Sequence, residues 1–260
     1  MTFIILYGYF RSGTSFFYRL LKENAQDKIV LYEPDHTNLI NMINTFNYVE
    51  LHQPGNFKPF EEYSKLPDDI REKIKQLWIK DPCPLTLNDR LKEYIKFLEK
   101  WSDVIKVNRW GFIIDDIMNT LPCAKLIIIM RNIYEVVQSH YNVFLRTKDH
   151  NAFDNLHYFN KIRARIPKYI LNHVDQTNII DRVIINYLTT YSYVLSKIPL
   201  FYDRVLIIRY KDAKNDQMLK ILSDFTGIEI MRNVYIEKQR KIDEKIKERV
   251  DYFLRLFSDL

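Results

Sequence analysis

Residues 8–15, Gly8-Tyr9-Phe10-Arg11-Ser12-Gly13-Thr14-Ser15, form a glycine-containing turn between two contrasting segments. The apolar run 3–6 before it predicts a buried strand, and the amphipathic run 16–21 after it predicts a helix. Two glycines allow a tight turn and a close approach of the backbone to a ligand. The N–H groups and the dipole at the start of a helix favour an anion there. The stretch therefore predicts a phosphate-binding turn between a strand and a helix.

The spacing of the two glycines matches the phosphate-binding loop of nucleotide enzymes, but one residue departs from that pattern. The loop normally has four residues between its glycines, followed by Lys and then Ser or Thr. Here Thr14 stands in place of the lysine, and the cation of the loop is Arg11. Thr14 cannot reach the β- and γ-phosphates of ATP or GTP as a lysine does. The change from Lys to Thr14 argues against a nucleoside triphosphate as ligand. It favours a nucleotide with an anionic group near its 5′ end, held beside Arg11.

The octet resembles the loop that binds the 5′-phosphosulfate group in sulfotransferases, where the cation is Lys or Arg. The resemblance implies that the donor is 3′-phosphoadenosine 5′-phosphosulfate (PAPS), bound by Arg11 and the four residues after it. Those four residues are Ser12, Gly13, Thr14 and Ser15. The resemblance also implies transfer of a sulfuryl group to a hydroxyl or amine acceptor by in-line displacement.

Two other classes of protein are compatible with the same loop. One is a P-loop nucleotide kinase or NTPase that has lost its lysine. The other is a non-catalytic nucleotide-binding module on the same scaffold. A preference for ATP–Mg²⁺ over 3′-phosphoadenosine 5′-phosphate (PAP) would indicate the first class, and binding without transfer would indicate the second.

The composition of the whole chain is that of a globular protein. Its 260 residues suit a single domain, 1–260, and 47% of them are apolar, which is enough for a sizeable core. The net charge of +6 is spread among interleaved acidic and basic residues. Such a charge suits an anionic small ligand and is too diffuse to indicate a nucleic-acid partner.

Cysteine usage and the lengths of the apolar runs indicate the compartment. Two cysteines, Cys83 and Cys123, cannot form a disulfide framework, so a reducing compartment is expected. No apolar run approaches the roughly 20 residues that cross a bilayer. The run 1–6 is too short for a signal sequence and is better explained as the first strand. We therefore expect a cytoplasmic protein without an integral membrane segment.

Apolar runs alternate with amphipathic stretches, which defines the fold class. Strands are predicted at 3–6, 29–32, 104–107, 125–130 and 205–208. Helices are predicted at 16–21, 37–46, 67–80, 87–101, 112–120, 133–145, 153–173 with a kink or break at Pro167, 179–198, 212–226 and 237–257. The unbroken apolar character of 126–130 is typical of a parallel sheet covered on both faces. The sequence thus predicts a three-layer, P-loop-like α/β fold with a central, mainly parallel sheet of about five strands.

Ligands of such sheets bind at the carboxyl ends of the strands, so the residues directly after strands are candidates. These are residues 8–15, 33–36, 108–109, 131 and 209–210. Arg131 follows the fourth predicted strand, and Ser139 lies eight residues on, about two turns into the next helix. An Arg fork and a hydroxyl can both donate to phosphate. The pattern resembles the 3′-phosphate site of sulfotransferases, with Ile133 where that family usually has proline. The resemblance implies that Arg131 and Ser139 bind the 3′-phosphate of PAPS.

The last part of the chain both matches that family and departs from it. Residues 205–227 resemble its late strand-and-helix segment, with Lys211-Asp212 where the family usually has Glu-Asp, and Asp212 is expected to cap the helix. Cytosolic members also carry a late Arg-Lys-Gly stretch that helps to hold the 3′-phosphate. Residues 231–233 and 239–241 lack its glycine, so it is open which late cation contributes, if any does.

Sulfuryl transfer needs a base for the acceptor proton and a cation for the leaving phosphate. Arg11 suits the second role. Glu33 follows the second predicted strand and precedes Pro34, which resembles the Glu-Pro element of carbohydrate-type sulfotransferases, whose base is a carboxylate. The cytosolic type uses a His after the third strand, where this chain has none. Glu33 is therefore the predicted base, on a strand expected beside the first one, and Asp35 and His36 on the same turn are its rivals.

The remaining predictions concern metal and acceptor. The six histidines show no ligand spacing, so no metal site is expected. The regions 47–101 and 153–198 are expected to be largely helical and to build the acceptor pocket. The acceptor itself is expected to be a small molecule or a carbohydrate; among acceptor types, a carbohydrate, a lipid headgroup, a peptide Tyr and a small alcohol all stay open.

Overall fold

The computed structural model describes residues 2–25, 27–49, 56–81, 83–149, 154–231 and 241–258. At its centre is a sheet of five strands: β1 (Ile4–Tyr7), β2 (Val30–Tyr32), β3 (Val104–Val107), β4 (Lys125–Met130) and β5 (Val205–Arg209). The order across the sheet is β2-β3-β1-β4-β5, and every neighbouring pair is parallel. The carboxyl ends of all five strands therefore lie along one edge.

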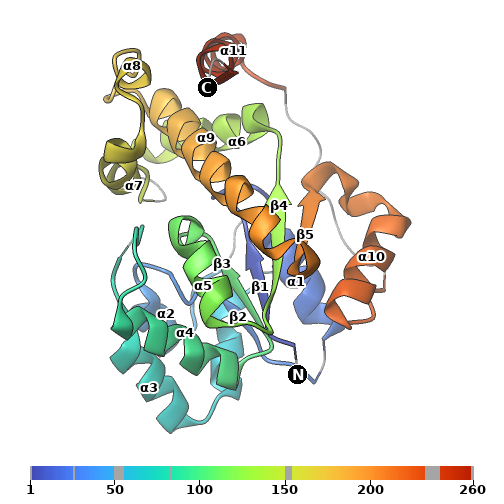
Figure 1. The fold of residues 1–260 in the computed structure, drawn as a ribbon. Coiled ribbons are helices and arrows are strands. Elements are labelled where there is room, and N and C mark those ends of the chain that lie inside the picture. The colour runs from blue at the N-terminus through green and yellow to red at the C-terminus, as the bar shows by residue number, and fades with distance from the viewer. Residues whose placement is uncertain are drawn as a thin grey trace.

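Helices flank this sheet on both faces. The α-helices are α1 (Thr14–Asn24), α2 (Leu39–Thr45), α3 (Asp68–Leu77), α4 (Asp89–Trp101), α5 (Ile114–Thr120), α6 (Ile133–Thr147), α7 (Asn155–Ile162), α8 (Lys168–Leu171), α9 (Ile179–Lys197), α10 (Asp216–Thr226) and α11 (Glu244–Ser258). The 3₁₀ helices are η1 (Pro59–Lys65), η2 (Gly111–Ile113), η4 (Arg163–Arg165), η5 (Ile198–Arg204) and η6 (Tyr210–Lys214). Figure 1 shows α5 and α9 in front of the sheet and α1 behind it. The predicted α/β fold with a central parallel sheet is confirmed.

Burial on both faces explains why the central strands are apolar almost throughout. Every side chain of β1 is at most 1% exposed. Lys106 of β3 is a charged residue among these apolar side chains, and it is nevertheless only 1% exposed. Its ammonium group lies 4.2 Å from the ring centre of Tyr32. A buried lysine needs a counter-charge, so its position points to a polar centre at the carboxyl end of β3.

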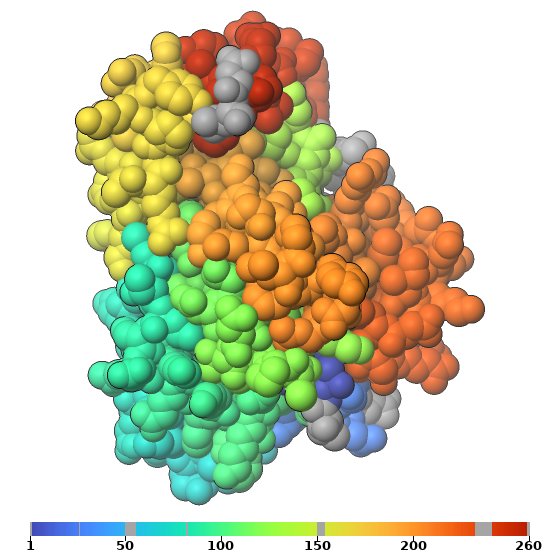
Figure 2. Space-filling model, viewed as in Figure 1, coloured from blue at the N-terminus to red at the C-terminus, as the bar shows by residue number. Residues whose placement is uncertain are grey.

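The last helix, α11, packs against α6 and α9, and Figure 2 shows it in red beside the green of α6. Asp181 of α9 is fully buried and accepts two bonds from Arg249 of α11, from Nε at 2.6 Å and from Nη2 at 2.5 Å. The N–H group of Asp243 donates to Gln138 of α6 at 2.7 Å. Helix α6, which carries Ser139, is thereby braced from the C-terminal side.

Several element boundaries differ from the predictions. Region 153–173 contains α7, η4 and α8, with the expected break at Pro167, which precedes the first residue of α8. The helix predicted from 212 begins at Asp216 and is capped by Asn215, so Asp212 is not its cap. Residues 241–243 are not helical, and α11 begins at Glu244, whereas 237–240 lie outside the described residues.

The expected position of the second strand is wrong. β2 pairs with β3 and not with β1. Consecutive strands are neighbours in most sheets but not in all, and here the three-residue β2 takes the edge position. The four-residue β3, whose side chains are all buried, takes the place between β1 and β2.

Candidate active site

The predicted phosphate-binding turn follows β1 and leads into α1. Gly13, the residue before α1, has a φ of 100°, a left-handed conformation that favours glycine. A Cβ atom at Gly13 would also lie only 2.2 Å from the ring of Tyr210. The first N–H groups of α1 have no acceptor within the helix, and the helix dipole places partial positive charge there. The turn is therefore suited to bind an anion.

Arg11 links this turn to the helix that carries Ser139. Its Nε donates to Ser139 Oγ at 2.8 Å. Arg131 Nη1 donates to the carbonyl oxygen of Arg11 at 3.4 Å, and its guanidinium lies 4.6 Å from the ring centre of Tyr210. The Nε of Arg131 also donates to Glu135 at 2.7 Å. Arg11, Arg131 and Ser139, predicted from separate parts of the sequence, thus lie together at one edge of the sheet.

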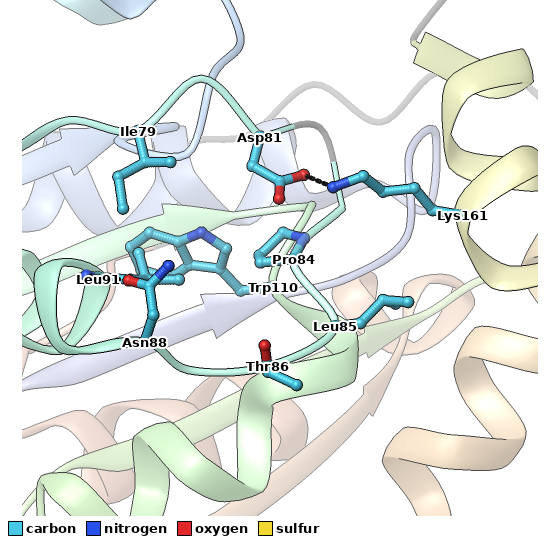
Figure 3. A pocket seen from close by; sticks show the side chains of 9 residues that line it. All are labelled: Ile79, Asp81, Pro84, Leu85, Thr86, Asn88, Leu91, Trp110 and Lys161. Carbon is cyan, nitrogen blue, oxygen red and sulfur yellow. Dashed lines mark hydrogen bonds and ion pairs between the residues drawn. The ribbon is translucent and has the colours of Figure 1, made fainter.

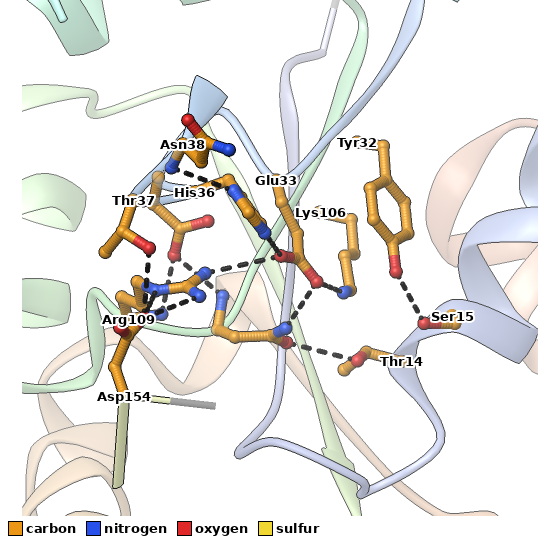
Figure 4. A network of polar contacts seen from close by, with 12 residues as sticks. Thr14, Ser15, Tyr32, Glu33, His36, Thr37, Asn38, Lys106, Arg109 and Asp154 are labelled. Carbon is orange, nitrogen blue, oxygen red and sulfur yellow. Dashed lines mark hydrogen bonds and ion pairs between the residues drawn. The ribbon is translucent and has the colours of Figure 1, made fainter. Parts of the chain in front are cut away.

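The other side chains of the turn contact the protein itself. Ser12 is fully buried. Thr14 Oγ1 donates to Asn108 Oδ1 at 3.1 Å, and Ser15 Oγ lies 2.9 Å from the hydroxyl of Tyr32. Thr14 and Ser15 therefore connect the start of α1 to the ends of β3 and β2. Figure 4 shows the contact between Ser15 and Tyr32.

Glu33 lies at the centre of the charged network in Figure 4. It follows β2 in a left-handed conformation, with a φ of 43°. Its Oε1 accepts from Lys106 Nζ and from Asn108 Nδ2, the latter at 2.7 Å. Its Oε2 accepts from Arg109 Nη1 at 3.3 Å and lies 4.0 Å from His36 Nε2. Both carboxylate oxygens are thus held by side chains from β3 and the turn after it.

Arg109 is held from a second side as well. Its Nη2 donates to Asp154 Oδ2 at 3.1 Å, and Thr37 Oγ1 donates to the same oxygen at 3.1 Å. The guanidinium also lies 4.9 Å from the ring centre of Phe10 in the turn after β1. Because Arg109 is only 3% exposed, these contacts fix its position against Glu33.

Asp35 and His36 make bonds to backbone groups. Asp35 Oδ2 accepts from the N–H groups of Asn108 and Arg109 at 2.8 Å and 2.5 Å. Its buried Oδ1 has no hydrogen-bond partner among the residues that the structure describes. His36 Nδ1 accepts from the N–H group of Asn38 at 3.0 Å. The turn after β2 is thereby joined to the turn after β3.

The surroundings of the three candidate bases give them different proton affinities. Burial acts to raise the pKa of Glu33, but the charges of Lys106 and Arg109 outweigh it and lower the pKa to about 2. Burial raises the pKa of Asp35 to about 6, although Arg109 opposes this. Burial lowers the pKa of His36 to about 4, although Glu33 opposes this. At neutral pH Glu33 is ionised and His36 is neutral.

Lys106, Asn108 and Arg109 all contact Glu33. The sequence marks Asn108 and Arg109 as candidates by position alone, and it predicts no role for Lys106. A lysine inside an otherwise apolar strand is a signal for Lys106, since a buried cation requires a partner. Asn108 and Arg109 directly follow a strand, where ligand-binding residues gather. Of the late cations considered above, Arg232 and Arg240 lie outside the described residues, and Lys241 is exposed.

A pocket of about 260 Å³ lies where the connection from α3 to α4 faces α7 (Figure 3). It is lined by Ile79, Asp81, Pro84, Leu85, Thr86, Asn88, Leu91, Trp110 and Lys161. Lys161 Nζ donates to Asp81 Oδ1 at 2.5 Å, as Figure 3 shows. Trp110 directly follows Arg109 of the charged network. The lining residues come from both regions expected to hold the acceptor, 47–101 and 153–198, together with Trp110.

Among the residues that the structure describes, no group of three or more His, Cys, Asp or Glu side chains is placed to hold a metal ion. No helix within the described ranges combines the length and the apolar character needed to cross a bilayer.

A parallel sheet whose first strand leads through a glycine turn into a helix, with two arginines beside that turn, defines a P-loop-like α/β protein. The profile of the Sulfotransferase domain family matches residues 2–250, and the chain belongs to that family.

Individual relatives are more distant. An uncharacterized protein from Archaeoglobus fulgidus is 30% identical over 140 residues, which make up 50% of this chain and 44% of that protein. The match therefore spans less than half of that relative. The solved structure of a sulfotransferase from Alicyclobacillus acidocaldarius is 15% identical with a TM-score of 0.48, over 97% of this chain and 91% of that one. A sulfotransferase from Mycobacterium avium is 15% identical with a TM-score of 0.47, over 98% of this chain and 67% of that one.

Proposed function

We propose that the protein transfers a sulfuryl group from PAPS to a hydroxyl or amine of an acceptor by in-line displacement. The observation that carries this proposal is the bond from Arg11 to Ser139, with Arg131 on the carbonyl group of Arg11. It joins a loop suited to a 5′-phosphosulfate with a pair of donors suited to a 3′-phosphate. Membership of the sulfotransferase family supports the same donor.

The residues of the turn fit such a donor. The N–H groups of Gly13, Thr14 and Ser15 at the start of α1, together with Arg11, would hold the 5′-phosphosulfate. Arg131 and Ser139 would hold the 3′-phosphate through charge-assisted and neutral hydrogen bonds. When bound, PAPS supplies the sulfuryl group and a phosphate leaving group. Arg11 would stabilise the charge that develops on that phosphate.

Glu33 is the proposed base. It is ionised at neutral pH because its pKa is about 2, and an ionised carboxylate is an acceptor only. Such a low pKa makes a weak base while no anion is nearby. A phosphosulfate beside Arg11 brings negative charge toward Glu33, and like charge raises the pKa of a carboxylate. Donor binding would therefore increase the proton affinity of Glu33 before the acceptor hydroxyl attacks.

The pocket beside Trp110 is the proposed site for the part of the acceptor that does not react. Asp81 and Lys161 neutralise each other, and the remaining lining residues are apolar or uncharged. The pocket therefore suits an uncharged group of a small molecule or a carbohydrate. A cytoplasmic location, in keeping with the two cysteines, is part of the same proposal.

Titration of the protein with PAP and with ATP–Mg²⁺ tests the class of donor. Tighter, metal-independent binding of PAP is expected, whereas a preference for ATP–Mg²⁺ would overturn the proposal in favour of a nucleotide kinase or NTPase. A screen of hydroxyl and amine acceptors with labelled PAPS tests transfer. Binding of PAP with no transfer to any acceptor would favour a non-catalytic binding module.

Two variants test the base. Glu33→Gln keeps the shape and removes the basicity, so transfer should fall about 10²–10⁴-fold while PAP still binds. Because the change also leaves Lys106 without its carboxylate partner, thermal unfolding of the variant must be measured alongside. His36→Asn should have the milder effect. If His36→Asn abolishes transfer and Glu33→Gln does not, the base is His36.

A further inference from the structure

The strand order leaves a gap between the donor loop and Glu33. The loop follows β1 and Glu33 follows β2, but β3 lies between those two strands. Neighbouring strands are about 4.8 Å apart, so β1 and β2 are separated by roughly 10 Å. Whatever follows β3 must therefore stand between the loop and the carboxylate. That residue is Asn108.

Asn108 uses both ends of its side-chain amide in this position. Its Oδ1 accepts from Thr14 Oγ1 at 3.1 Å, and its Nδ2 donates to Glu33 Oε1 at 2.7 Å. Its backbone N–H group is also fixed by Asp35 Oδ2 at 2.8 Å. Asn108 is only 4% exposed, and its two side-chain partners, Thr14 and Glu33, are labelled in Figure 4.

The chemistry of the two neighbours fixes the direction of the amide. An ionised carboxylate can only accept, so the NH₂ group must face Glu33. The carbonyl oxygen then faces Thr14, whose hydroxyl can donate or accept and must donate here. The chain Thr14–Asn108–Glu33 therefore has one consistent orientation.

We propose that Asn108 is a positioning residue that holds the carboxylate of Glu33 at a fixed place relative to the donor loop. The inference rests on the proposed sulfuryl transfer with Glu33 as base. Thr14 is the first residue of α1, so its hydroxyl moves with the loop. Through its bonds to Thr14 and Glu33, Asn108 fixes the distance between the loop and the carboxylate that must accept the proton. A displacement of about 1 Å in such a group costs up to about 10²-fold in rate.

A double-mutant cycle tests this role. Asn108→Leu keeps the number and branching of the side-chain heavy atoms and removes both amide hydrogen bonds. With PAPS and an acceptor from the screen, kcat should fall about 10–100-fold, while the Kd of PAP changes by less than about threefold. In a Glu33→Gln background the same change should lower kcat no further, because the two residues act as a unit. Multiplication of the two separate effects in the double variant would overturn the proposal.

A second variant gives a readout that does not depend on activity. Asn108→Asp keeps an acceptor for Thr14 but places a second carboxylate against Glu33, which raises the pKa of Glu33. The other charged groups around Glu33 are Lys106, Arg109 and His36, with Asp154 and Asp35 bound to Arg109; none of these is altered. The ¹³Cδ resonance of Glu33, identified by its loss in Glu33→Gln, should titrate at a higher pH in Asn108→Asp than in the parent.

Asn132→Asp serves as the control, since Asn132 caps α6 after the neighbouring strand β4 and does not contact Glu33. It should leave the Glu33 titration unchanged. An unchanged titration in Asn108→Asp would overturn the inference. Failure of the proposed function would be seen separately, as absence of PAP binding and of transfer by the parent protein.

Discussion

Arg11 is the single residue on which the proposed chemistry depends most. Its φ of 66° is left-handed, and alanine would adopt that conformation at a similar cost, so Arg11→Ala isolates the guanidinium. Transfer should fall about 10²–10³-fold, the size of losing one charge-stabilising donor, and PAP binding should fall less. Single-turnover rates with labelled PAPS measure this.

Arg19→Ala is the matched control for Arg11. Arg19 lies further along α1, where its Nε donates to Glu23 at 2.5 Å on the exposed side. It should leave transfer unchanged. Nearly unchanged turnover in Arg11→Ala as well would remove Arg11 from the mechanism.

Arg131 and Ser139 should discriminate for the 3′-phosphate. Arg131→Ala and Ser139→Ala should each weaken PAP binding by about 1.5–3 kcal/mol, the value of a charge-assisted contact. Adenosine 5′-phosphosulfate, which has no 3′-phosphate, should bind to parent and variants almost equally. Glu135→Gln should tighten PAP binding, because it releases Arg131 from its carboxylate partner at 2.7 Å. Calorimetric titration of the three variants with both nucleotides measures these changes. Equal losses for both nucleotides would contradict the assignment.

For these residues the local conformation could be predicted from the sequence, but the contacts with distant residues could not. The turn 8–15 could be predicted because its conformation is set locally, by glycines and by the strand and helix that flank it. The surroundings of Glu33 could not, because they depend on Lys106 and Arg109, which lie more than 70 positions away. Their charges reverse the effect of burial on the pKa of Glu33, and no local pattern reports that.

At the scale of elements, the same division between local and distant causes holds. The five strands follow from apolar runs. The order of the strands in the sheet does not follow from these runs. It depends on the connections between strands and on how deeply each position in the sheet is buried. The wrong expected position of β2 also hides the proposed role of Asn108, because Asn108 stands between the loop and Glu33 only when β3 lies between β1 and β2.

The ion pair between Asp181 of α9 and Arg249 of α11, called the clamp below, should contribute much of the stability of the C-terminal part. Arg249→Met leaves the fully buried carboxylate of Asp181 without its cation, which should cost about 3–5 kcal/mol in the free energy of unfolding. Urea unfolding measures this. Lys247→Met, on the same helix, removes only an exposed pair with Glu244 at 3.4 Å, and should change stability by less than about 1 kcal/mol. Equal effects of the two changes would show that the clamp is not stabilising.

The pocket between the α3–α4 connection and α7 can be blocked without touching the charged network. Thr86 lines it from an exposed position, so Thr86→Trp should fill it. The KM for the acceptor should then rise about tenfold or more, the effect of losing roughly 1.4 kcal/mol of binding, while the Kd of PAP stays the same. Lys96→Trp places the same ring on an exposed position of α4 outside the pocket and should be neutral. An unchanged KM in Thr86→Trp would place the acceptor elsewhere.

At the scale of the whole molecule, buried ionisable groups make stability depend on pH. Burial and the charge of Arg11 lower the pKa of His140 to about 3, and burial lowers that of His36 to about 4. Below the ordinary value of 6.5 the unfolded chain binds these protons and the folded chain does not, so stability is lost as pH falls. Asp35, with its pKa raised to about 6, acts in the opposite direction between pH 6 and its ordinary value of 3.8.

Between pH 6 and pH 4, His36 and His140 each lower the free energy of unfolding as the pH falls. Asp35 raises it by about as much as one of the two histidines lowers it. The sum of these three groups predicts a loss in the free energy of unfolding of about 1.4 kcal/mol per pH unit. Asp35→Asn should double that slope, whereas His140→Phe, which keeps an aromatic ring at this position, should bring it close to zero. Urea unfolding at pH 4.5, 5.5 and 6.5 measures the slopes. A slope in Asp35→Asn no steeper than that of the parent would mean that Asp35 stays ionised in the fold, and that the bonds from Asn108 and Arg109 outweigh its burial.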